Sequence, residues 1–475
     1  MPTIASFPQS AAAHTLTARP TRIRRLRLLA LVAATYFMVS GGPYGLEDIV
    51  GQAGYARALL LLLIVPAIWS LPTALMIGEL ASALPEEGGF YIWVERALGR
   101  FWGFQEAWLS LAASVFDMAV YPALAVAYLT QLYPALTAGE RGLAWSLGIV
   151  VLCVAWNLRG AYSVGQGSLW MLALLLTPFL GIVGCGLWHI ATHPAISNAH
   201  FAGFAAPLHG SMTIALLFVL WNYMGWDNAS TIAREVENPR RNYIRAMLYA
   251  VTLVAASYIL PIAVVAFTGI PAATFVTGSW VSAARVLATG LLGSRVASWL
   301  AFAVLAGGAL TGVAMFNALT LSYARVPAAM AVDGMLPRVL ARRMKNGVPW
   351  VAVLACAGGW ALALGLNLTR LLELDIMLYG LSLMLEFIAL VVLRMREPAL
   401  ARPFRVPGGV WMAISLGVAP SLLIFFTIWA ARGDRITPHL PAIALGAMIA
   451  VAGTLAYPLT LLRKSRRTPV PDTAA

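Results

Sequence analysis

The sequence has few charged residues, which make up 11% of its 475 positions, whereas 60% of the positions are hydrophobic. Soluble domains carry about 25% charged residues, so this shortage excludes a soluble protein and indicates a chain that crosses a membrane several times. Cysteine is scarce too, and Cys153, Cys185 and Cys356 all fall in apolar stretches, which argues against a disulfide framework. The six histidines lie outside the centres of these stretches, and no nucleophile motif is present. We therefore expect no metal site, no cofactor and no enzymatic activity.

Twelve apolar segments account for the hydrophobic composition. As a helix, each can cross the roughly 30 Å hydrocarbon core of a bilayer, some with a tilt or a break. The sequence predicts an all-α integral membrane protein with a tail over 1–26, a ten-helix core over 27–393, a loop and two further helices over 394–462, and a tail over 463–475. The segments lie at roughly 27–54, 58–82, 102–132, 142–158, 162–190, 211–233, 243–269, 298–324, 348–367, 371–393, 410–430 and 439–462.

The chain is nonetheless basic, with a formal net charge of +13. If both termini are cytoplasmic, most Lys and Arg residues fall on the cytoplasmic side, in agreement with the positive-inside rule. The charge therefore indicates an orientation in the inner or plasma membrane and not a nucleic-acid partner. The basic residues that fall on the opposite side are Arg57, Arg141, Arg285, Arg295, Arg370, Arg432 and Arg435.

Two of the segments are interrupted by residues that break helices. The first contains Ser40-Gly-Gly-Pro-Tyr-Gly45, and the sixth contains Asn222-Tyr-Met-Gly-Trp-Asp-Asn228. Glycine is a poor helix former and proline lacks an N–H group, and non-helical backbone at membrane depth is tolerated where it is buried or lines a cavity. Corresponding breaks in two halves are typical of the substrate site of secondary transporters. They predict two five-helix halves of inverted topology; simple kinks are the alternative, but a kink does not account for Asp227.

Several carboxylates fall inside or beside the apolar segments, where acids are costly and usually functional. No Lys interrupts a segment and the Arg residues lie at segment ends, so the acids have no evident internal counter-ion. The sequence therefore predicts a positively charged substrate, proton coupling, or both. The acids are Glu47, Asp48, Glu79, Glu106, Asp117, Asp227 and Glu386.

Asp227 is the strongest single candidate. It follows the second break and lies beside Trp221, Tyr223 and Trp226, whose rings can form a cage for an ammonium group. The alternative is that Asp227 only caps the half-helix that follows it.

The third segment carries a second candidate, Asp117, with Tyr121 and Tyr128 on the same helix face. Packing between helices is the alternative for the tyrosines. Glu79 can be either a gate or an interfacial residue, and Glu386 either a proton carrier or an acid satisfied by neighbouring hydroxyl groups. The proton-coupling candidates are Glu79, Asp117, Asp227 and Glu386, and the expected substrate contacts are Gly41, Gly42, Tyr44, Gly45, Glu47, Asp48, Asp117, Tyr121, Trp221, Asn222, Tyr223, Trp226 and Asp227.

A series of motifs carries a resemblance to a known family. The chain resembles the amino acid–polyamine–organocation superfamily, and within it the polyamine uptake transporters first associated with plants and protozoan parasites. The similarity is dense over roughly 36–130 and 215–260. The motifs are Ser40-Gly-Gly-Pro-Tyr-Gly-Leu-Glu-Asp48, Ile68-Trp-Ser-Leu-Pro-Thr-Ala-Leu75, Gly78-Glu-Leu80, Pro85-Glu-Glu-Gly-Gly-Phe-Tyr-Ile-Trp93, Phe101-Trp-Gly103, Trp226-Asp-Asn-Ala-Ser-Thr231, Glu235-Val-Glu-Asn-Pro239, Leu385-Glu-Phe387 and Arg402-Pro-Phe-Arg-Val-Pro407.

The resemblance implies a leucine-transporter-type fold with two extra C-terminal helices, proton-coupled alternating access around segments 1, 3, 6, 8 and 10, and a substrate amine near Asp227. Amino-acid members usually hold the substrate carboxylate on free N–H groups at the first break. Here Pro43 removes a donor while Glu47 and Asp48 add negative charge, which favours a polyamine such as putrescine or spermidine. A proton-coupled permease for cationic or neutral amino acids is the alternative, and a solute sensor without transport is a remote one. Some relatives have a protonatable Lys in segment 5, which is absent here. We expect a cationic amine, protons and lipid as partners, and no obligatory protein partner.

Overall fold

The computed structural model describes residues 25–137, 140–194, 210–433, 435–437 and 440–465. The first half of this chain is helical apart from its connections. Its helices are α1 (Leu28–Val39), α2 (Glu47–Ala53), α3 (Tyr55–Val65), a π-helical turn η1 (Pro66–Ser70), α4 (Leu71–Ala83), α5 (Phe90–Leu98), α6 (Arg100–Leu132), α7 (Pro134–Thr137), α8 (Glu140–Asn157) and α9 (Ala161–Thr192).

The second half continues in the same way, with a small hairpin near its end. Its elements are α11 (Met212–Asn222), the 3₁₀ helices η2 (Trp226–Thr231) and η3 (Ala233–Glu235), α12 (Pro239–Val265), η4 (Ala272–Thr274), α13 (Ser279–Tyr323), α14 (Arg325–Val332), η5 (Arg338–Ala341), α15 (Trp350–Ala361), α16 (Leu368–Arg396), α17 (Gly409–Ala430), η6 (Ala431–Gly433), the antiparallel strands β1 (Arg435–Thr437) and β2 (Leu440–Pro441), and α18 (Ala442–Ser465).

Eight helical stretches in the described chain are long and apolar enough to cross a membrane, so this is a multi-pass membrane protein. The other predicted segments hold α1 with α2, α8, α11 with η2, and α15. The predicted tails over 1–26 and 463–475 lie outside the described residues except for 25–26 and 463–465. The eight stretches are Tyr55–Ala83, Arg100–Gln131, Ala161–Thr192, Pro239–Val265, Ser279–Val332, Leu368–Arg396, Gly409–Ala430 and Ala442–Thr460.

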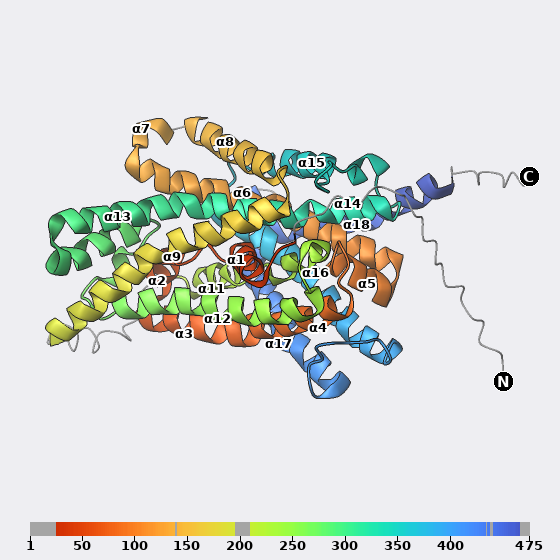
Figure 1. Ribbon diagram of the computed structural model, residues 1–475, viewed down its shortest axis with the longest axis horizontal. Coiled ribbons are helices and arrows are strands. Elements are labelled where there is room, and N and C mark those ends of the chain that lie inside the picture. Colours follow the sequence, from red (N-terminus) through yellow and green to blue (C-terminus); the bar gives the residue numbers. More distant parts are fainter. Residues whose placement is uncertain (1–24, 138–139, 195–209, 434, 438–439, 466–475) are drawn as a thin grey trace, which may run out of the picture.

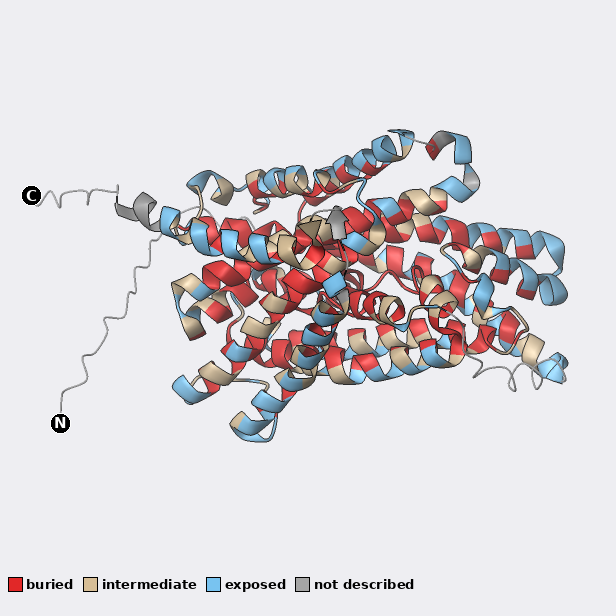
Figure 2. Ribbon diagram, turned by 180° about the vertical axis from the view of Figure 1, so that it is seen from behind, coloured by how far each residue is buried: buried red, intermediate tan, exposed pale blue. Residues whose placement is uncertain are grey.

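The long helices α9, α12 and α13 and the continuous stretch of α3, η1 and α4 run along the length of the molecule, and α1 and α11 lie between them (Figure 1). Helix α1 packs against α9, α12 and α13, and α6 packs against both α13 and α16. Buried residues are concentrated along this interior, whereas exposed residues follow the outer faces of the peripheral helices (Figure 2). The interrupted helices are therefore the most enclosed part of the bundle.

Both predicted interruptions are present. Helix α1 ends at Val39 and α2 begins at Glu47, with Gly42 and Gly45 between them at positive φ, where glycine is the residue without steric cost. Helix α11 ends at Asn222, and Gly225 has a φ of +88° before η2 starts at Trp226. A Cβ atom on Gly225 would lie 2.3 Å from the carbonyl oxygen of Met38, so the two breaks touch each other. The ends of α1 and α11 thus meet inside the bundle.

Helix α13 has two parts, and the segment predicted at 298–324 lies within the second part. Residues 279–292 form a helix that bends into the rest of α13 at Gly293, whose φ of 78° is not helical. The indole N–H of Trp280, in this first part, donates a 2.8 Å hydrogen bond to the carbonyl oxygen of Pro43. This short helix therefore rests directly on the first break.

Candidate functional site

A small cavity lies where the two breaks meet. It has space for about one water molecule, so an organic substrate can enter only if the surrounding helices move apart. Its lining comes from the ends of α1 and α11 and from α6, α13 and α16. The lining residues are Met38, Val39, Asp117, Tyr121, Trp221, Met224, Gly225, Tyr323, Asp375 and Tyr379.

Asp117 is held on one wall by three donors. Its Oδ1 atom accepts hydrogen bonds from the Tyr121 hydroxyl at 2.5 Å and from the indole N–H of Trp221 at 3.2 Å. Its Oδ2 atom accepts one from the Tyr323 hydroxyl at 3.3 Å. The rings of Tyr121 and Trp221 stack with their centroids 5.9 Å apart. Asp117 and Tyr121, which were predicted on one helix face, therefore contact each other. Trp221, which was predicted beside Asp227, joins them in one unit assembled from α6, α11 and α13.

Asp227 reaches the cavity through Tyr379. The Tyr379 hydroxyl donates a 2.5 Å hydrogen bond to Oδ1 of Asp227 and accepts one of 3.0 Å from the N–H group of Gly225. Asp227 itself is buried in η2, immediately after the second break. One phenol on α16 thus connects the second break to the carboxylate that follows it.

Asp375 is a member of the site that we did not predict from the sequence. It lies on α16 four residues before Tyr379, is buried, and lines the cavity. Within the described part of the chain, its Oδ2 atom has no hydrogen-bond partner. The rule that singled out the other acids applies to it as well, because Asp375 falls inside the apolar segment 371–393. Tyr323 and Tyr379 were also missed, since tyrosine alone gives no comparable signal.

The three carboxylates make the site strongly electronegative. Asp117, Asp227 and Asp375 are close enough to interact electrostatically with one another. Among the residues that the structure describes, no Lys or Arg lines the cavity. Four aromatic rings complete the lining, and both carboxylates and aromatic faces attract organic cations. The geometry therefore suits a positively charged ligand.

Glu47 and Asp48 belong to a different cluster, at the end of the first break where α2 begins. Glu47 accepts hydrogen bonds from the Tyr128 hydroxyl at 2.6 Å and from the N–H groups of Gly278 at 3.1 Å and Gly45 at 2.8 Å. Asp48 accepts one from the Thr277 hydroxyl at 2.7 Å. These acids tie the first break to the segment before α13, and they are not part of the lining of the cavity as described.

Other predicted contacts hold the breaks in place. The hydroxyl groups of Tyr44 and Tyr223 donate to the carbonyl oxygens of Val304 and Leu62. The Asn222 side chain donates to the Phe218 carbonyl oxygen, and the Gly41 carbonyl oxygen accepts from Thr311. Trp226 is fully buried. Of the predicted aromatic cage, Trp221 lines the cavity, whereas Tyr223 and Trp226 are not among the residues described around it.

Glu79 has the internal counter-ions that the sequence did not reveal. Its carboxylate forms ion pairs with Arg394 and Arg402 and accepts a 2.8 Å hydrogen bond from the N–H group of Val406. The expectation that the intramembrane acids lack such partners is therefore wrong for Glu79. The cause is tertiary, because the connection after α16 folds back over the end of α4. Since two guanidinium groups and a backbone N–H group already occupy the Glu79 carboxylate, this geometry does not favour a proton-carrying role for it.

Glu106 on α6 and Glu386 on α16 are both buried and lie close enough to interact electrostatically. Glu106 Oε1 accepts a 2.8 Å hydrogen bond from the Ser382 hydroxyl. In the described structure, Glu106 Oε2 and both carboxylate oxygens of Glu386 have no hydrogen-bond partner. The alternative that neighbouring hydroxyl groups satisfy Glu386 is therefore not what the structure shows.

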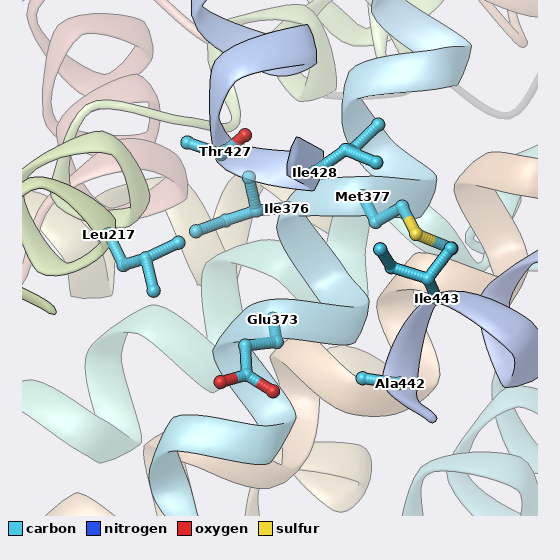
Figure 3. Close-up of a pocket in the computed structure, with 8 residues that line it drawn as sticks. All are labelled: Leu217, Glu373, Ile376, Met377, Thr427, Ile428, Ala442 and Ile443. Carbon is cyan, nitrogen blue, oxygen red and sulfur yellow. The ribbon is translucent and has the colours of Figure 1, made fainter. Parts of the chain in front are cut away.

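A second pocket, on the opposite side of α16, has a different character. Apart from Glu373 and Thr427 its lining is apolar, and Glu373 precedes Asp375 by two residues, which turns the two acids to different faces of the helix. This pocket lies between α11, α16, α17 and the start of α18 (Figure 3). Its lining residues are Leu217, Glu373, Ile376, Met377, Thr427, Ile428, Ala442 and Ile443.

Similar proteins are transporters. Residues 32–452 match the family model described as amino acid permease. A probable polyamine transporter of Arabidopsis thaliana is 34% identical over 439 residues, which cover 92% of this chain and 84% of the relative. The polyamine transporter PUT1 of Oryza sativa subsp. japonica is 32% identical over 433 residues, covering 90% and 78%. The serine/threonine exchanger SteT of Bacillus subtilis is 26% identical over 436 residues, covering 86% and 90%. These matches confirm the resemblance drawn from the motifs, and the chain belongs to the amino acid permease family.

Proposed function

We propose that this protein is a secondary transporter that takes up polyamines of the putrescine or spermidine class together with protons, by alternating access. The observation that carries the proposal is the cavity at the meeting point of the two breaks, with Asp117, Asp375 and, through Tyr379, Asp227 around it. Relatives named as polyamine transporters at 32–34% identity support the same substrate class. We assign Asp117 and Asp375 to one ammonium group and Asp227 to another.

The first break also disfavours an amino acid as the substrate. An α-carboxylate needs free N–H donors such as those at the end of a broken helix. Here the Gly42 N–H group donates to the Ser40 hydroxyl at 2.9 Å, and that of Gly45 donates to Glu47 at 2.8 Å. At the second break the Gly225 N–H group donates to Tyr379. These donors are already satisfied by side chains, so they favour a substrate that carries no carboxylate.

The proposal includes an architecture and a location. The ten-helix core over 27–393 would consist of two inverted five-helix repeats whose first helices carry the breaks, and the two helices over 394–462 would lie outside the repeat. The basic residues favour an inner or plasma membrane location with both termini cytoplasmic. Glu47 and Asp48, bound to Tyr128, Gly278 and Thr277, would act as an outer closure and not as substrate ligands.

Uptake into proteoliposomes tests the substrate class. Purified protein is reconstituted, the membrane potential is clamped at zero with potassium and valinomycin, and labelled putrescine or spermidine is offered with and without an inward proton gradient. We expect accumulation that requires the gradient. Uptake of arginine, serine or leucine without competition from putrescine would contradict the polyamine assignment. It would support the alternative of an amino acid permease, in line with the similarity to SteT. Saturable binding without any transport would support a solute sensor.

A further inference from the structure

One face of α16 carries polar residues beyond the cavity. Asp375, Tyr379, Ser382 and Glu386 follow the spacing i, i+4, i+7 and i+11, which places them along a single face of the helix. Asp375 and Tyr379 line the cavity, whereas Glu386 lies about 10 Å beyond Tyr379 along the helix axis. Glu386 is therefore nearer to the C-terminal end of α16, where Arg394 forms an ion pair with Glu79. The polar face therefore connects the proposed substrate site to one end of the bundle.

Helix α6 runs antiparallel to α16 and meets this face with a second acid. Glu106 accepts the hydrogen bond from Ser382, and Glu106 and Glu386 are close enough to interact electrostatically. Each of them also interacts in this way with Asp227. Both side chains are completely buried. The two glutamates thus form a pair that is separate from the cavity but within electrostatic reach of it.

No described basic side chain neutralises this pair. Arg96 on α5 is paired with Glu397, Arg100 on α6 with Glu95, and Arg394 with Glu79, while Arg370 and Arg396 at the ends of α16 are exposed. The described residues of α11 and α17 carry no charge. Apart from the pair itself, the acids on α4, α6, α16 and η2 are Glu79, Asp117, Asp227, Glu373 and Asp375.

Two carboxylates that interact in a buried site are not stable when both are ionised, since like charges repel and neither is solvated. A proton held by the pair removes one charge and supplies a hydrogen-bond donor, which Glu106 Oε2 and both Glu386 oxygens lack in the described structure. An ammonium group would need space, and the residues described around the cavity do not include either glutamate. A proton needs no cavity.

We propose that Glu106 and Glu386 form the proton-binding site of this transporter, separate from the substrate site and linked to it through Asp227. The inference rests on the proton coupling of the proposed function and assigns it to particular residues. The step is the protonation of one carboxylate from one side of the membrane and the release of the same proton to the other side. When the bundle closes around a cation, Asp117, Asp227 and Asp375 gain counter-charge from the substrate, whereas the glutamate pair gains it only from a proton. Closure therefore requires both ions.

The test separates transport from coupling in the same proteoliposomes. The variants are Glu386→Gln, Glu106→Gln and the double variant, and the matched control is Glu373→Gln, which removes a carboxylate from the other face of α16 (Figure 3). Counterflow of labelled putrescine against internal unlabelled putrescine measures substrate exchange without a gradient. Accumulation driven by a proton gradient, and proton entry reported by an internal pH dye, measure coupling.

We expect the glutamine variants to keep counterflow at any pH between 6 and 8 and to lose gradient-driven accumulation and substrate-dependent proton entry, while the control keeps all three. Accumulation and proton entry retained by the double variant would overturn the proposal. The proposal would also be overturned if the variants of Glu106 and Glu386 lost counterflow while remaining monodisperse and able to bind putrescine. The pair would then be needed for substrate exchange itself.

Infrared spectroscopy supplies a readout that does not depend on transport. The wild-type protein should show the carbonyl stretch of a protonated carboxyl group, and the double variant should lose that band, whereas Glu373→Gln should not. If the wild-type protein carries an amino acid and no putrescine, the substrate class is wrong, and the same coupling assays with that amino acid still decide the role of the pair. If the wild-type protein transports without moving protons, both the coupling and the pair's assignment are wrong.

Discussion

The Tyr379 hydroxyl lies between the Gly225 N–H group and the Asp227 carboxylate, accepting from the first at 3.0 Å and donating to the second at 2.5 Å. This arrangement holds the backbone of the second break in place. It also orients Asp227, the carboxylate that we propose binds a substrate amine. We expect Tyr379→Phe to weaken putrescine binding about tenfold or more, since a hydrogen bond to a charged group contributes roughly 1.5–3 kcal/mol. Binding measured by scintillation proximity checks this. An unchanged affinity would show that Asp227 is not oriented by Tyr379 for binding.

Removing the charge of Asp117 should abolish substrate binding at the cavity. In Asp117→Asn, the amide cannot pair with an ammonium group, and its NH₂ group would face the donors Tyr121, Trp221 and Tyr323. We expect saturable uptake of putrescine to be lost while the protein remains monodisperse. Glu140→Gln, which removes an exposed carboxylate at the start of α8, is the control and should transport as the wild type does. Saturable uptake retained by Asp117→Asn would remove Asp117 from the substrate site.

Because the two breaks are in contact, we expect that adding a single methyl group at Gly225 lowers both stability and transport. In Gly225→Ala the new Cβ atom would lie 2.3 Å from the Met38 carbonyl oxygen, at a φ of +88° that alanine rarely adopts. A strained residue of this kind costs of order 1–3 kcal/mol, so both thermal stability in detergent and transport should fall. Gly184→Ala on α9 is the matched control, because nothing lies within 4 Å of its Cβ position. Equal melting temperatures for the two variants would contradict the packing described here.

Glu79 should behave as a structural anchor. Removing one member of a buried ion pair leaves an uncompensated charge and typically costs about 3–5 kcal/mol. We therefore expect Glu79→Ala to lower the melting temperature strongly, because Arg394 and Arg402 lose their partner. This explanation can be checked by comparing the melting temperature of Glu79→Ala with that of the double variant Glu79→Ala/Arg394→Met. If the double variant is no more stable than the single one, the unpaired guanidinium group of Arg394 is not the cause of the lower melting temperature.

The exposed pair between Arg96 and Glu397 offers a contrast that depends on pH. The hydrogen bonds from Arg96 lower the pKa of Glu397 in the folded protein. Its contribution to stability is therefore present above the unfolded-state pKa of Glu, roughly 4.3, and is lost as the pH falls through the lowered folded-state pKa. We expect the difference in melting temperature between the wild type and Glu397→Gln to be small, since such pairs are solvent-screened, and to vanish in acid. A difference that grows on acidification would contradict this sign.

Comparison of the sequence with the structure shows which features local patterns can predict. Gly42, Gly45 and Gly225 identified both breaks, because the effect of glycine on a helix is local. The partners of Glu79 and Glu47 could not be predicted, since Arg402 and Gly278 reach them only through the folding of distant connections. The segment predicted at 298–324 lies within the part of α13 that follows the bend at Gly293. The part before the bend covers the first break, a contact that hydropathy does not encode.

Asp375 shows a different limit, because the same reasoning that selected Glu386 covers it. The sequence alone does not show which face of α16 turns inward, since Glu373 lies on a different face of the helix from Asp375 and Glu386. Contact with α6 settles this question in favour of Asp375 and Glu386. A side chain on an apolar helix can be assigned to a site only when the helices that pack against each face are known.

The hydrogen bonds of Glu47 have a mechanical consequence. This carboxylate joins the turn at Gly45, the end of α6 at Tyr128 and the start of α13 at Gly278. Any movement that opens this end of the bundle must either break hydrogen bonds of a buried carboxyl group or carry α2, the first part of α13 and the end of α6 as one rigid piece. The second route leaves the energetically costly contacts intact, so the hinge for such a motion must lie elsewhere, at the bend of Gly293 and at the backbone around Gly42.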